Sequence, residues 1–293
     1  MDPWPDIAAA IGSATGRSFS IEGREAIGGG CINAAWRVAG SDRSYFVKIN
    51  EAAKASMFAA EADGLAAIAA TKTLRVPQPV CHGGNEHTSW LVVEFIALGR
   101  ERPGGMRMLG RQLAALHRTT RDRFGWDHKN TIGATPQTNT PSIDWVAFWR
   151  KHRLGFQLSL AARNGYTGAV QREGERLMDR LPAFFKTYRP QPSLLHGDLW
   201  SGNAAFDDAG APVTFDPAVY YGDREADLAM TELFGGFYGE FYQAYREAFP
   251  LDPGYTVRRD LYNLYHALNH LNLFGGGYLA QSERLMARLL AAC

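Results

Sequence analysis

Apolar and polar positions in the first hundred residues follow two different periods. Residues 17–50 and 80–96 contain short runs of β-branched and aromatic residues, such as SYFVKIN and WLVVEF, which predict strands. Between them, the alanine-rich residues 54–70 predict one helix that ends before Pro77 and Pro79. The N-terminal part is therefore expected to form a sheet with one helix.

Helical periodicity dominates from about residue 105 onward, and only the stretch around residues 194–215 contains strand-like pieces. The expected helices cover residues 105–119, 142–163, 168–187, 223–249 and 257–291. This pattern predicts an α+β, bilobal fold: a small β-rich N-lobe, residues 1–96, and a larger, mainly helical C-lobe, residues 97–293. A ligand is expected between two such lobes.

Composition and charge exclude some classes of partner. Of the 293 residues, 46% are hydrophobic and 21% charged, and the formal net charge is +1. Nucleic acid is not an expected partner, because phosphate binding demands a basic excess. No apolar run approaches the roughly 18–20 residues that a membrane span requires. The longest candidate, WLVVEFIAL, is interrupted by Glu94. Membrane insertion is therefore not expected.

The cysteines indicate a reducing compartment. Cys31, Cys81 and Cys293 are scattered, odd in number and form no CxxC pair, which fits a cytoplasmic protein better than a disulfide framework. The N-terminus MDPWPDIAAAIG is acidic and interrupted by proline, unlike a signal peptide. Cys31 lies in a glycine-rich segment where a thiol could make activity redox-sensitive, but an inert small residue is the favoured interpretation.

The segment LLHGDLWSGN, residues 194–203, carries the strongest chemical signal. Asp198 and Asn203 are five positions apart, the D-x-x-x-x-N spacing in which an aspartate accepts a hydroxyl proton and an asparagine holds a metal ion. Asp216 ends an apolar run in VTFDPAVY and is expected to be a second oxygen ligand for Mg²⁺, which prefers hard donors. The simpler alternative is a loop aspartate that caps a helix. The combined spacing favours phosphoryl transfer.

The N-terminal half contains the matching parts. Lys48 lies on the predicted strand YFVKIN, and Glu61 lies within the apolar stripe of the following helix, where a carboxylate needs a partner. We expect Lys48 to pair with Glu61 and reach phosphates; the alternative is an exposed lysine and a solvated glutamate. Gly28, Gly29 and Gly30 bring backbone N–H groups close to phosphate, although a triple glycine alone is more often a turn.

The last strand of the N-lobe ends in Glu94, Phe95 and Ile96. We expect this stretch to be the hinge between the lobes, where backbone groups bind the edge of an adenine. Side-chain identity is then secondary, so the stretch serves equally as a connector.

Other polar residues are expected to be structural. His117 falls on an apolar helical stripe, and Asp227 is expected to cap or brace the HGD segment. His266 and His270 are four residues apart and could hold zinc on one helix face, but no third ligand is evident.

Nearly the whole chain resembles the fructosamine kinases, or ketosamine-3-kinases. This family is a branch of the aminoglycoside-phosphotransferase and choline-kinase group, which has a protein-kinase-like fold. The resemblance rests on GGGCINAAWRV, FVKIN, EADGL, FGWDHKNTIGATPQTN, DWVAFWRKHRLGFQL, LLHGDLWSGN, FDPAVYYGDREADLAMTELFGGF and LYNLYHALNHLNLFGGGY. The middle and late blocks are more specific than HGD, which the whole group shares.

The resemblance implies an ATP- and Mg²⁺-dependent kinase that phosphorylates the sugar O3 hydroxyl of a ketosamine. Phosphorylation there permits elimination of phosphate and release of the amine, which is deglycation. Implied roles are catalytic base for Asp198, magnesium ligands for Asn203 and Asp216, a phosphate-orienting pair for Lys48 and Glu61, and adenine hinge for residues 94–96. DPA replaces the DFG of protein kinases, and the chain has no room for an activation loop.

The residues that bind the phosphoryl acceptor are less clearly indicated by the sequence. Trp200 is expected to flank the sugar or stack on the cationic amine, the alternative being a tryptophan packed beneath the loop. Asp223 and Glu225 are further candidates for binding that amine.

Two alternatives stay open at this point. One is a kinase of the same fold for an aminoglycoside, choline or another amino-alcohol, and the other is a catalytically silent nucleotide-binding interaction protein. The sequence does not choose among ribulose-, erythrulose- and fructose-derived amines, nor give the oligomeric state.

Overall fold

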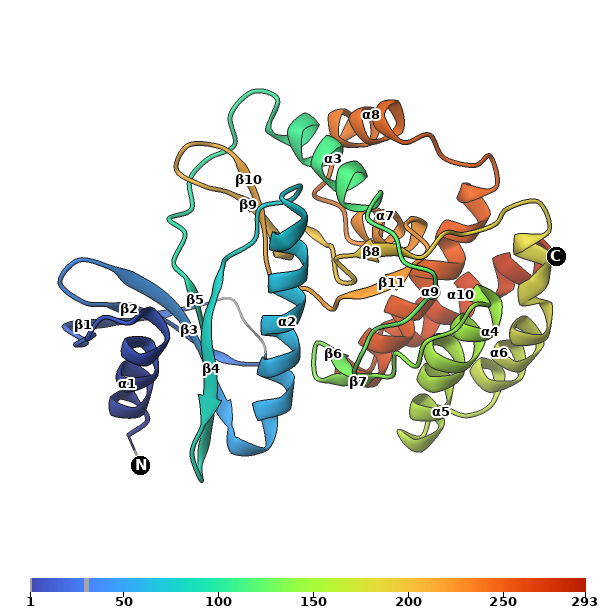
Figure 1. Cartoon of the computed structure of the whole chain (residues 1–293). Coiled ribbons are helices and arrows are strands. Elements are labelled where there is room, and N and C mark those ends of the chain that lie inside the picture. The colour runs from blue at the N-terminus through green and yellow to red at the C-terminus, as the bar shows by residue number, and fades with distance from the viewer. Residues whose placement is uncertain (1, 29–31) are drawn as a thin grey trace. The chain divides into compact units, whose positions relative to one another are not determined.

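Five antiparallel strands form the sheet of the N-terminal part (Figure 1). Their order is β1-β2-β3-β5-β4, and their bounds are β1 Gly23–Ile27, β2 Ala34–Ala39, β3 Ser44–Glu51, β4 Pro79–Gly84 and β5 Thr88–Glu94. The strands lie within the two ranges where the apolar alternation predicts them, except that β3 ends one residue later and β4 begins one residue earlier. The computed structural model describes residues 2–28 and 32–293, so Gly29, Gly30 and Cys31 lie outside the described residues.

One helix covers each face of this sheet (Figure 1). Helix α2, Ala55–Thr71, agrees with the predicted helix to within one residue. Helix α1, Trp4–Thr15, was not predicted, because the prolines near its start were interpreted as breakers. Proline is tolerated in a first helical turn, and Ile7 and Ile11, four residues apart, are fully buried against the sheet.

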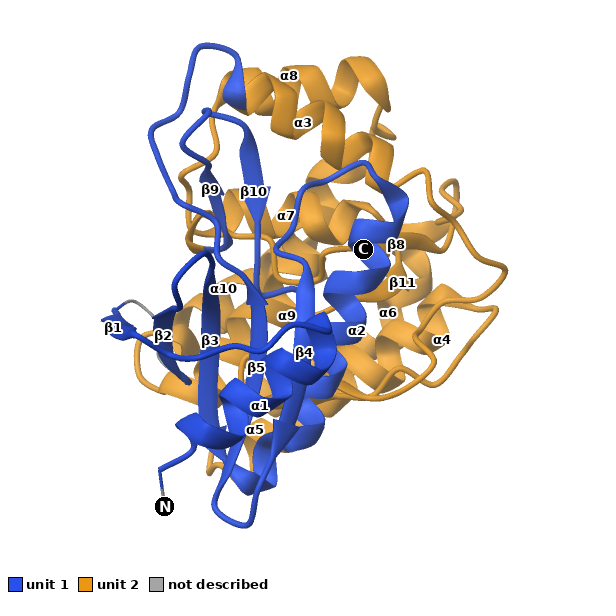
Figure 2. Ribbon diagram, turned by 60° about the vertical axis from the view of Figure 1, so that its left-hand side comes forward, with its two compact units in different colours: residues 1–105, 203–217 blue, residues 106–202, 218–293 orange. Residues whose placement is uncertain are grey.

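The chain divides into two compact units, coloured separately in Figure 2. Unit 1 contains Met1–Gly105 and Asn203–Pro217, and unit 2 contains Met106–Gly202 and Ala218–Cys293. We expected a boundary after residue 96 and one continuous C-lobe. A later hairpin, β9 Ala204–Phe206 and β10 Pro212–Thr214, instead belongs to unit 1. Backbone hydrogen bonds explain this: Gly99 donates to Phe206 at 2.9 Å, and Thr214 donates to Arg75 at 2.9 Å.

Unit 2 is mainly helical, as the periodicity predicts. Its helices are α3 Gly105–Leu116, α4 Trp145–Trp149, α5 Gly155–Arg163, α6 Ala169–Arg180, α7 Glu225–Leu233, α8 Gly239–Ala248, α9 Tyr255–Phe274 and α10 Tyr278–Ala291. Its short two-stranded pairs are β6 Asn130–Ile132 with β7 Thr135–Gln137, and β8 Ser193–Leu195 with β11 Tyr220–Gly222.

Glycines divide two of the predicted helical runs. The run 223–249 contains α7 and α8, separated where Gly235 and Gly236 adopt positive φ angles of 74° and 92°. The run 257–291 contains α9 and α10, separated at Gly275 and Gly276, which also have positive φ. Residues other than glycine rarely adopt a positive φ angle, which the α-helix does not allow, so these glycines end the preceding helices.

No helix within residues 2–28 and 32–293 is long and apolar enough to cross a membrane.

Candidate active site

Lys48 occupies the face of the sheet opposite helix α1. On β3, Tyr45 and Val47 point into the apolar core against α1, so the alternation of a strand directs Lys48 to the other face. The Nζ atom of Lys48 lies 2.6 Å from Oε1 of Glu61 on α2 and 2.7 Å from Oδ1 of Asp216. The predicted pair with Glu61 is present, and the structure adds Asp216 to it.

Burial makes this ion-pair cluster electrostatically strong. Burial alone lowers the pKa of Lys48, but the charges of Glu61 and Asp216 outweigh it and raise the pKa above its usual value. Burial raises the pKa of Glu61, and the Lys48 charge opposes that rise only in part. Lys48 therefore stays protonated at neutral pH, in a fixed position between two carboxylates.

Asp216 has an unusual backbone. Its φ angle is 56°, one of only two positive values among the described non-glycine residues. Asp and Asn tolerate this conformation better than most residues, and residues held in it cluster at active sites as well as in turns and at helix ends, where Lys72 caps α2. The Asp216 side chain is 48% exposed, so Lys48 does not occupy all of its oxygen surface.

Asn203 and Asp216 emerge from the same end of the β9–β10 hairpin. The hairpin pairs Ala204 with Thr214, and the Phe215 N–H donates to the Asn203 carbonyl at 3.1 Å, which extends the ladder beyond the strands. This register brings the two predicted oxygen ligands into one neighbourhood of unit 1.

Asp198 lies in the HGD loop, residues 196–198, directly after β8 in unit 2. Gly197 has a φ of 84°, and a Cβ atom there would collide with the carbonyl oxygen of Ala218. The Ala218 N–H donates to the His196 carbonyl at 2.8 Å, so the two segments approach closely. Only glycine satisfies both conditions.

The carboxylate of Asp227 holds the HGD loop from helix α7, as expected. It accepts hydrogen bonds from the backbone N–H groups of His196 at 2.7 Å and Gly197 at 2.8 Å. It also lies 3.1 Å from Nε2 of His117, whose Nδ1 contacts the Tyr245 hydroxyl at 2.8 Å. His117 is thus a buried, hydrogen-bonded histidine, in agreement with its predicted structural role.

The pKa of Asp227 reflects this role. Burial alone raises it, but the hydrogen bond and charge interaction with His117 and the Gly197 N–H outweigh burial and lower the pKa below its usual value. Asp227 is therefore ionised at neutral pH, and it positions the backbone next to Asp198.

Trp200 is exposed rather than packed beneath the loop. Its side chain is 38% exposed, and its ring lies edge-on to Phe234, with 6.1 Å between centroids. Phe234 lies 4.8 Å from the ring of His270 on α9. We call Trp200, Phe234 and His270 the aromatic group. Sequence reasoning missed Phe234 and His270 as neighbours of Trp200, because the three come from separate segments; the one local signal was the accumulation of rings around them.

The structure argues against the prediction that Asp223 and Glu225 bind the amine. Both carboxylates are buried. Asp223 accepts from the hydroxyls of Tyr188 at 2.9 Å and Tyr262 at 2.5 Å, and Glu225 accepts two bonds from Arg258 at 2.7 and 2.9 Å. Burial raises the pKa of both, that of Glu225 to about 7 with help from the Asp223 charge. We assign both to the packing of α7 against α9.

The expected hinge begins where β5 ends, at Glu94. The Glu94 carboxylate accepts from Arg75 at 3.0 Å and from the Gln78 N–H at 3.2 Å. In the described part of the chain no backbone hydrogen bond involves Phe95 or Ile96. A Cβ atom on Gly28, which follows β1, would meet open space, so packing does not explain that glycine.

The model of one protein family, the fructosamine kinases, matches residues 3–292. The chain belongs to the fructosamine kinase family. A probable ketoamine kinase of Synechocystis sp. is 48% identical, with 98% of this chain and 97% of that one covered. A chloroplastic protein-ribulosamine 3-kinase of Oryza sativa subsp. japonica is 46% identical over 92% of this chain and 80% of its own.

A solved structure supports the same assignment. A crystal structure from Haemophilus somnus, assigned to the fructosamine-3-kinases, has a TM-score of 0.90 and 30% identity, with 98% of this chain and 97% of that chain covered. The α+β, protein-kinase-like fold and the family predicted from the sequence are confirmed. As a member of the fructosamine kinase family, the protein is a phosphotransferase that uses ATP and acts on a sugar hydroxyl.

Proposed function

We propose that the protein transfers the γ-phosphoryl group of ATP to the O3 hydroxyl of a ketosamine, with Asp198 as the catalytic base. Relatives named ketoamine kinase and protein-ribulosamine 3-kinase support the ketosamine acceptor, and a ribulose-derived adduct is the first to test. These names do not favour an aminoglycoside, choline or other amino-alcohol as acceptor, nor a silent interaction protein.

The observation that carries the proposal is the cluster of Lys48, Glu61 and Asp216. Its lysine stays charged and is held in one position by carboxylates 2.6 and 2.7 Å away. A preorganised cation is what phosphoryl transfer requires, since the protein contributes mainly positioning and charge stabilisation. We assign Lys48 to the phosphates of ATP and Glu61 to orienting Lys48.

Asn203 and Asp216 suit Mg²⁺ by the chemistry of their donor atoms. Both supply hard oxygen atoms, and Asp216 keeps exposed carboxylate surface. The described residues contain no cluster of three or more His, Cys, Asp or Glu side chains that would hold a metal alone. Mg²⁺ in kinases takes few protein ligands and completes its shell with water and phosphate oxygens, so two are sufficient. When bound, the ion neutralises charge on the phosphates.

Asp198 supplies the proton acceptor. A carboxylate on a loop fixed by Asp227 and Gly197 can orient the O3 hydroxyl and accept its proton as the phosphoryl group transfers.

The nucleotide has its own candidate contacts in unit 1. The uncommitted backbone groups of Phe95 and Ile96, next to Glu94, support an adenine-binding role. The open space at Gly28 supports close approach of phosphate to the backbone of that residue. Gly29 and Gly30, which the sequence assigns to the same phosphate-binding segment, lie outside the described residues.

We assign the amine end of the ketosamine to the aromatic group. Aromatic faces attract a cationic amine, and exposed Trp200 lies two residues from Asp198. Trp200→Ala is expected to weaken ketosamine binding about tenfold, equivalent to a cation–π contact of about 1–2 kcal/mol, while ATP binding is unchanged. Equal affinity of the wild type and the variant for the ketosamine would refute this contact.

The proposal is tested by ADP release in the presence of Mg²⁺ and a ribulose-modified lysine peptide. Wild-type protein is expected to release ADP only with the modified peptide, and Asp198→Asn is expected to abolish the release. Asp179→Asn, on the exposed side of α6, is a matched control that should keep full activity. Equal turnover by Asp198→Asn overturns the assigned base, and turnover of an aminoglycoside or choline in place of the peptide overturns the acceptor.

The free thiols of Cys81 and Cys293 support a cytoplasmic, reducing location, which cell fractionation tests directly.

A further inference from the structure

Arg153 is a buried charge that lies among uncharged groups of unit 2. The residue is 0% exposed, and its guanidinium donates to the carbonyls of Thr138 at 2.9 Å and His152 at 3.1 Å and to Oδ1 of Asn139 at 2.8 Å. Within residues 2–28 and 32–293 no carboxylate forms an ion pair with it. The roles assigned above do not use this charge.

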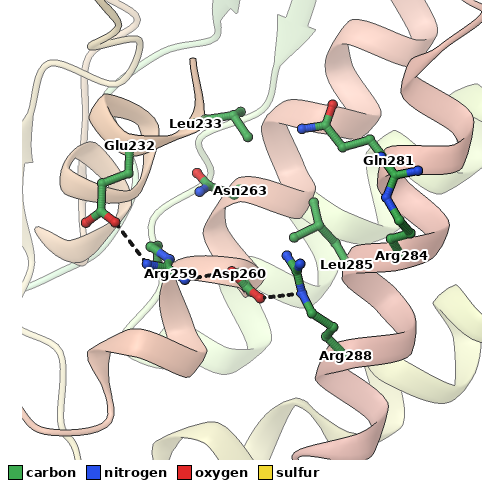
Figure 3. Close-up of a pocket in the computed structure, with 9 residues that line it drawn as sticks. All are labelled: Glu232, Leu233, Arg259, Asp260, Asn263, Gln281, Arg284, Leu285 and Arg288. Atoms are coloured by element: carbon green, nitrogen blue, oxygen red, sulfur yellow. Dashed lines mark hydrogen bonds and ion pairs between the residues drawn. The ribbon is translucent and has the colours of Figure 1, made fainter. Parts of the chain in front are cut away.

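Other arginines of unit 2 meet carboxylates. Arg259 lies 3.0 Å from Glu232, and Arg288 lies 2.9 Å from Asp260 (Figure 3). The buried Arg258 lies 2.7 Å from Glu225. Burying a guanidinium without such a partner is costly, and an apolar side chain of similar size is often equally good or better for stability. Stability alone therefore does not explain an arginine at position 153.

A π-helical turn directs Arg153 to the interior. Residues Arg150–Leu154 form this turn between α4 and α5. The buried positions step from Phe148 and Trp149 to Arg153 and Leu154, five residues later, whereas an α-helix returns to the same face after about 3.6 residues. π-helical turns are rare and are frequently found at functional sites.

Buried amides connect Arg153 to the strand next to the HGD loop. Asn139, which accepts from Arg153, donates from Nδ2 to Oδ1 of Asn130 at 2.8 Å. Asn130 donates from its own Nδ2 to the Val219 carbonyl at 2.7 Å. Both asparagines are buried, so water does not compete for these hydrogen bonds. The chain of contacts therefore transmits the position of Arg153 to Val219.

A second contact reaches the same segment directly. The Cζ atom of Arg153 lies 4.1 Å from the ring centroid of Tyr220. Tyr220 pairs with Leu195 of β8, the residue that precedes the HGD loop, and the Ala218 N–H donates to the His196 carbonyl at 2.8 Å. The segment that Arg153 holds thus runs along the beginning of the HGD loop.

Tyr265 of α9 lies near the charges of both Arg153 and Asp198. Burial raises the pKa of Tyr265 to about 12; the Arg153 charge opposes this rise, and the Asp198 charge adds to it. The Tyr265 hydroxyl donates to Oε1 of Gln137 at 2.8 Å, and Nε2 of Gln137 donates to Asn130 at 2.9 Å. The same amides therefore join the surroundings of Asp198 to those of Arg153.

We propose that Arg153 is a positioning residue for phosphoryl transfer: it fixes residues 218–220 and, through them, the HGD loop that presents Asp198. Asp227 holds the N–H groups of this loop, whereas Arg153 holds the strand that binds its first carbonyl. The effect on turnover rests on the proposed function, in which Asp198 is the base. A displacement of a catalytic group by about 1 Å lowers the rate on the order of 100-fold.

Steady-state ADP release with the ribulose-modified peptide tests the effect on catalysis, at a temperature where every variant is folded. Arg153→Met is expected to lower kcat on the order of 100-fold and to leave the KM for ATP within about twofold. Arg153→Lys keeps the charge but not the planar fork that bonds Thr138 and Asn139 together, so its kcat should stay at least about tenfold below the wild type.

Arg43→Met is the matched control. Arg43 in unit 1 also donates to a carbonyl, that of Ser18 at 3.0 Å, and its Cζ atom lies 5.7 Å from the ring centroid of Phe19. It contacts no residue assigned to the site, so its replacement should leave kcat unchanged.

Hydrogen exchange measures the loop without turnover. In Arg153→Met the backbone N–H groups of residues 194–198 and 218–221 should exchange at least about tenfold faster than in the wild type, while exchange in α10 is unchanged. If the wild type does not phosphorylate the ketosamine, the proposed function fails, but exchange still tests whether Arg153 holds the loop.

A double variant tests the connection through Asn139. Arg153→Met/Asn139→Leu replaces both hydrogen-bonding partners with apolar groups, so it should fold at least as stably as Arg153→Met alone. Because both changes interrupt one connection, its kcat should equal that of Arg153→Met and not the product of the two separate losses.

Four results would overturn the proposal. They are a kcat of Arg153→Met within about threefold of the wild type, full activity of Arg153→Lys, unchanged exchange in residues 194–198, and losses of kcat that multiply in the double variant. If Arg153→Met does not fold, Arg153→Lys and the double variant decide by the same criteria.

Discussion

Replacing Asp227 with asparagine removes the charge that holds the HGD loop. In the wild type this carboxylate accepts from two backbone N–H groups at 2.7 and 2.8 Å and lies 3.1 Å from Nε2 of His117. Asparagine keeps the size of the side chain but offers one oxygen and an NH₂ group. That NH₂ group faces donors, so at least one buried N–H of the loop loses its acceptor.

The magnitude follows from these contacts. Hydrogen bonds to a buried charged group contribute about 1.5–3 kcal/mol each. One of these bonds is lost and the other is weakened, so we expect Asp227→Asn to lower the free energy of unfolding by about 2–4 kcal/mol. Because the backbone next to Asp198 loses its support, kcat is expected to fall on the order of 100-fold, whereas the KM for ATP changes little.

Urea unfolding and steady-state ADP release measure these two effects. Asp179→Asn is the same chemical change at an exposed position, so its free energy of unfolding should stay within about 0.5 kcal/mol of the wild type and its kcat should be unchanged. If the free energy of unfolding of Asp227→Asn lies within about 1 kcal/mol of the wild type and its kcat within about threefold, the HGD loop does not depend on the Asp227 carboxylate.

Three further predictions concern other buried groups. Lys48→Met leaves the carboxylate of Glu61 buried without its cation and should lower the free energy of unfolding, measured in urea, by about 3–5 kcal/mol. The double variant Lys48→Met/Glu61→Leu should recover most of the lost stability, and no recovery would contradict the pairing. Burial lowers the pKa of His266 to about 3. Between pH 7.5 and 5.5 the histidine therefore gains a proton only in the unfolded chain, which should lower the free energy of unfolding by about 1.4 kcal/mol over this range. His266→Leu should lose that much of the pH dependence of the free energy of unfolding, and an unchanged pH dependence would mean that the ring is accessible. Gly197→Ala should destabilise the protein by at least about 2 kcal/mol more than Gly165→Ala. Both glycines have positive φ, but only at Gly197 does a carbonyl oxygen, that of Ala218, lie where the Cβ atom would be. Equal thermal midpoints of the two variants would refute the close approach of Ala218 to Gly197.

Local patterns predicted the parts of the fold and site that depend on near neighbours. The strand that carries Lys48 and the helix that carries Glu61 follow from periodicity, and their contact follows because a buried carboxylate needs a cation. The expected brace by Asp227 is present, although its backbone partners, His196 and Gly197, lie 31 and 30 positions earlier in the chain. Helix α1 was missed because its prolines stand in the first turn, where they do not break a helix.

The remaining differences depend on contacts between distant residues. Asp223 and Glu225 resemble exposed loop acids in the sequence, but their partners Tyr262 and Arg258 lie 39 and 33 positions away on another helix. The hairpin that follows Asn203 belongs to unit 1 because of backbone bonds to Gly99 and Arg75, residues 107 and 139 positions earlier than their partners. No local pattern encodes such pairings, which tertiary packing decides.

The central claim is phosphorylation of a ketosamine with Asp198 as the base, and mass spectrometry tests it most directly. A ribulose-modified lysine peptide is incubated with the protein and Mg-ATP, beside Asp198→Asn. We expect the wild type to add the mass of one phosphate, followed by loss of the adduct and recovery of free lysine, and the variant to leave the peptide unchanged. An unmodified peptide after incubation with ATP-binding wild-type protein would contradict the claim for this sugar, and equal phosphorylation by Asp198→Asn would contradict the assigned base.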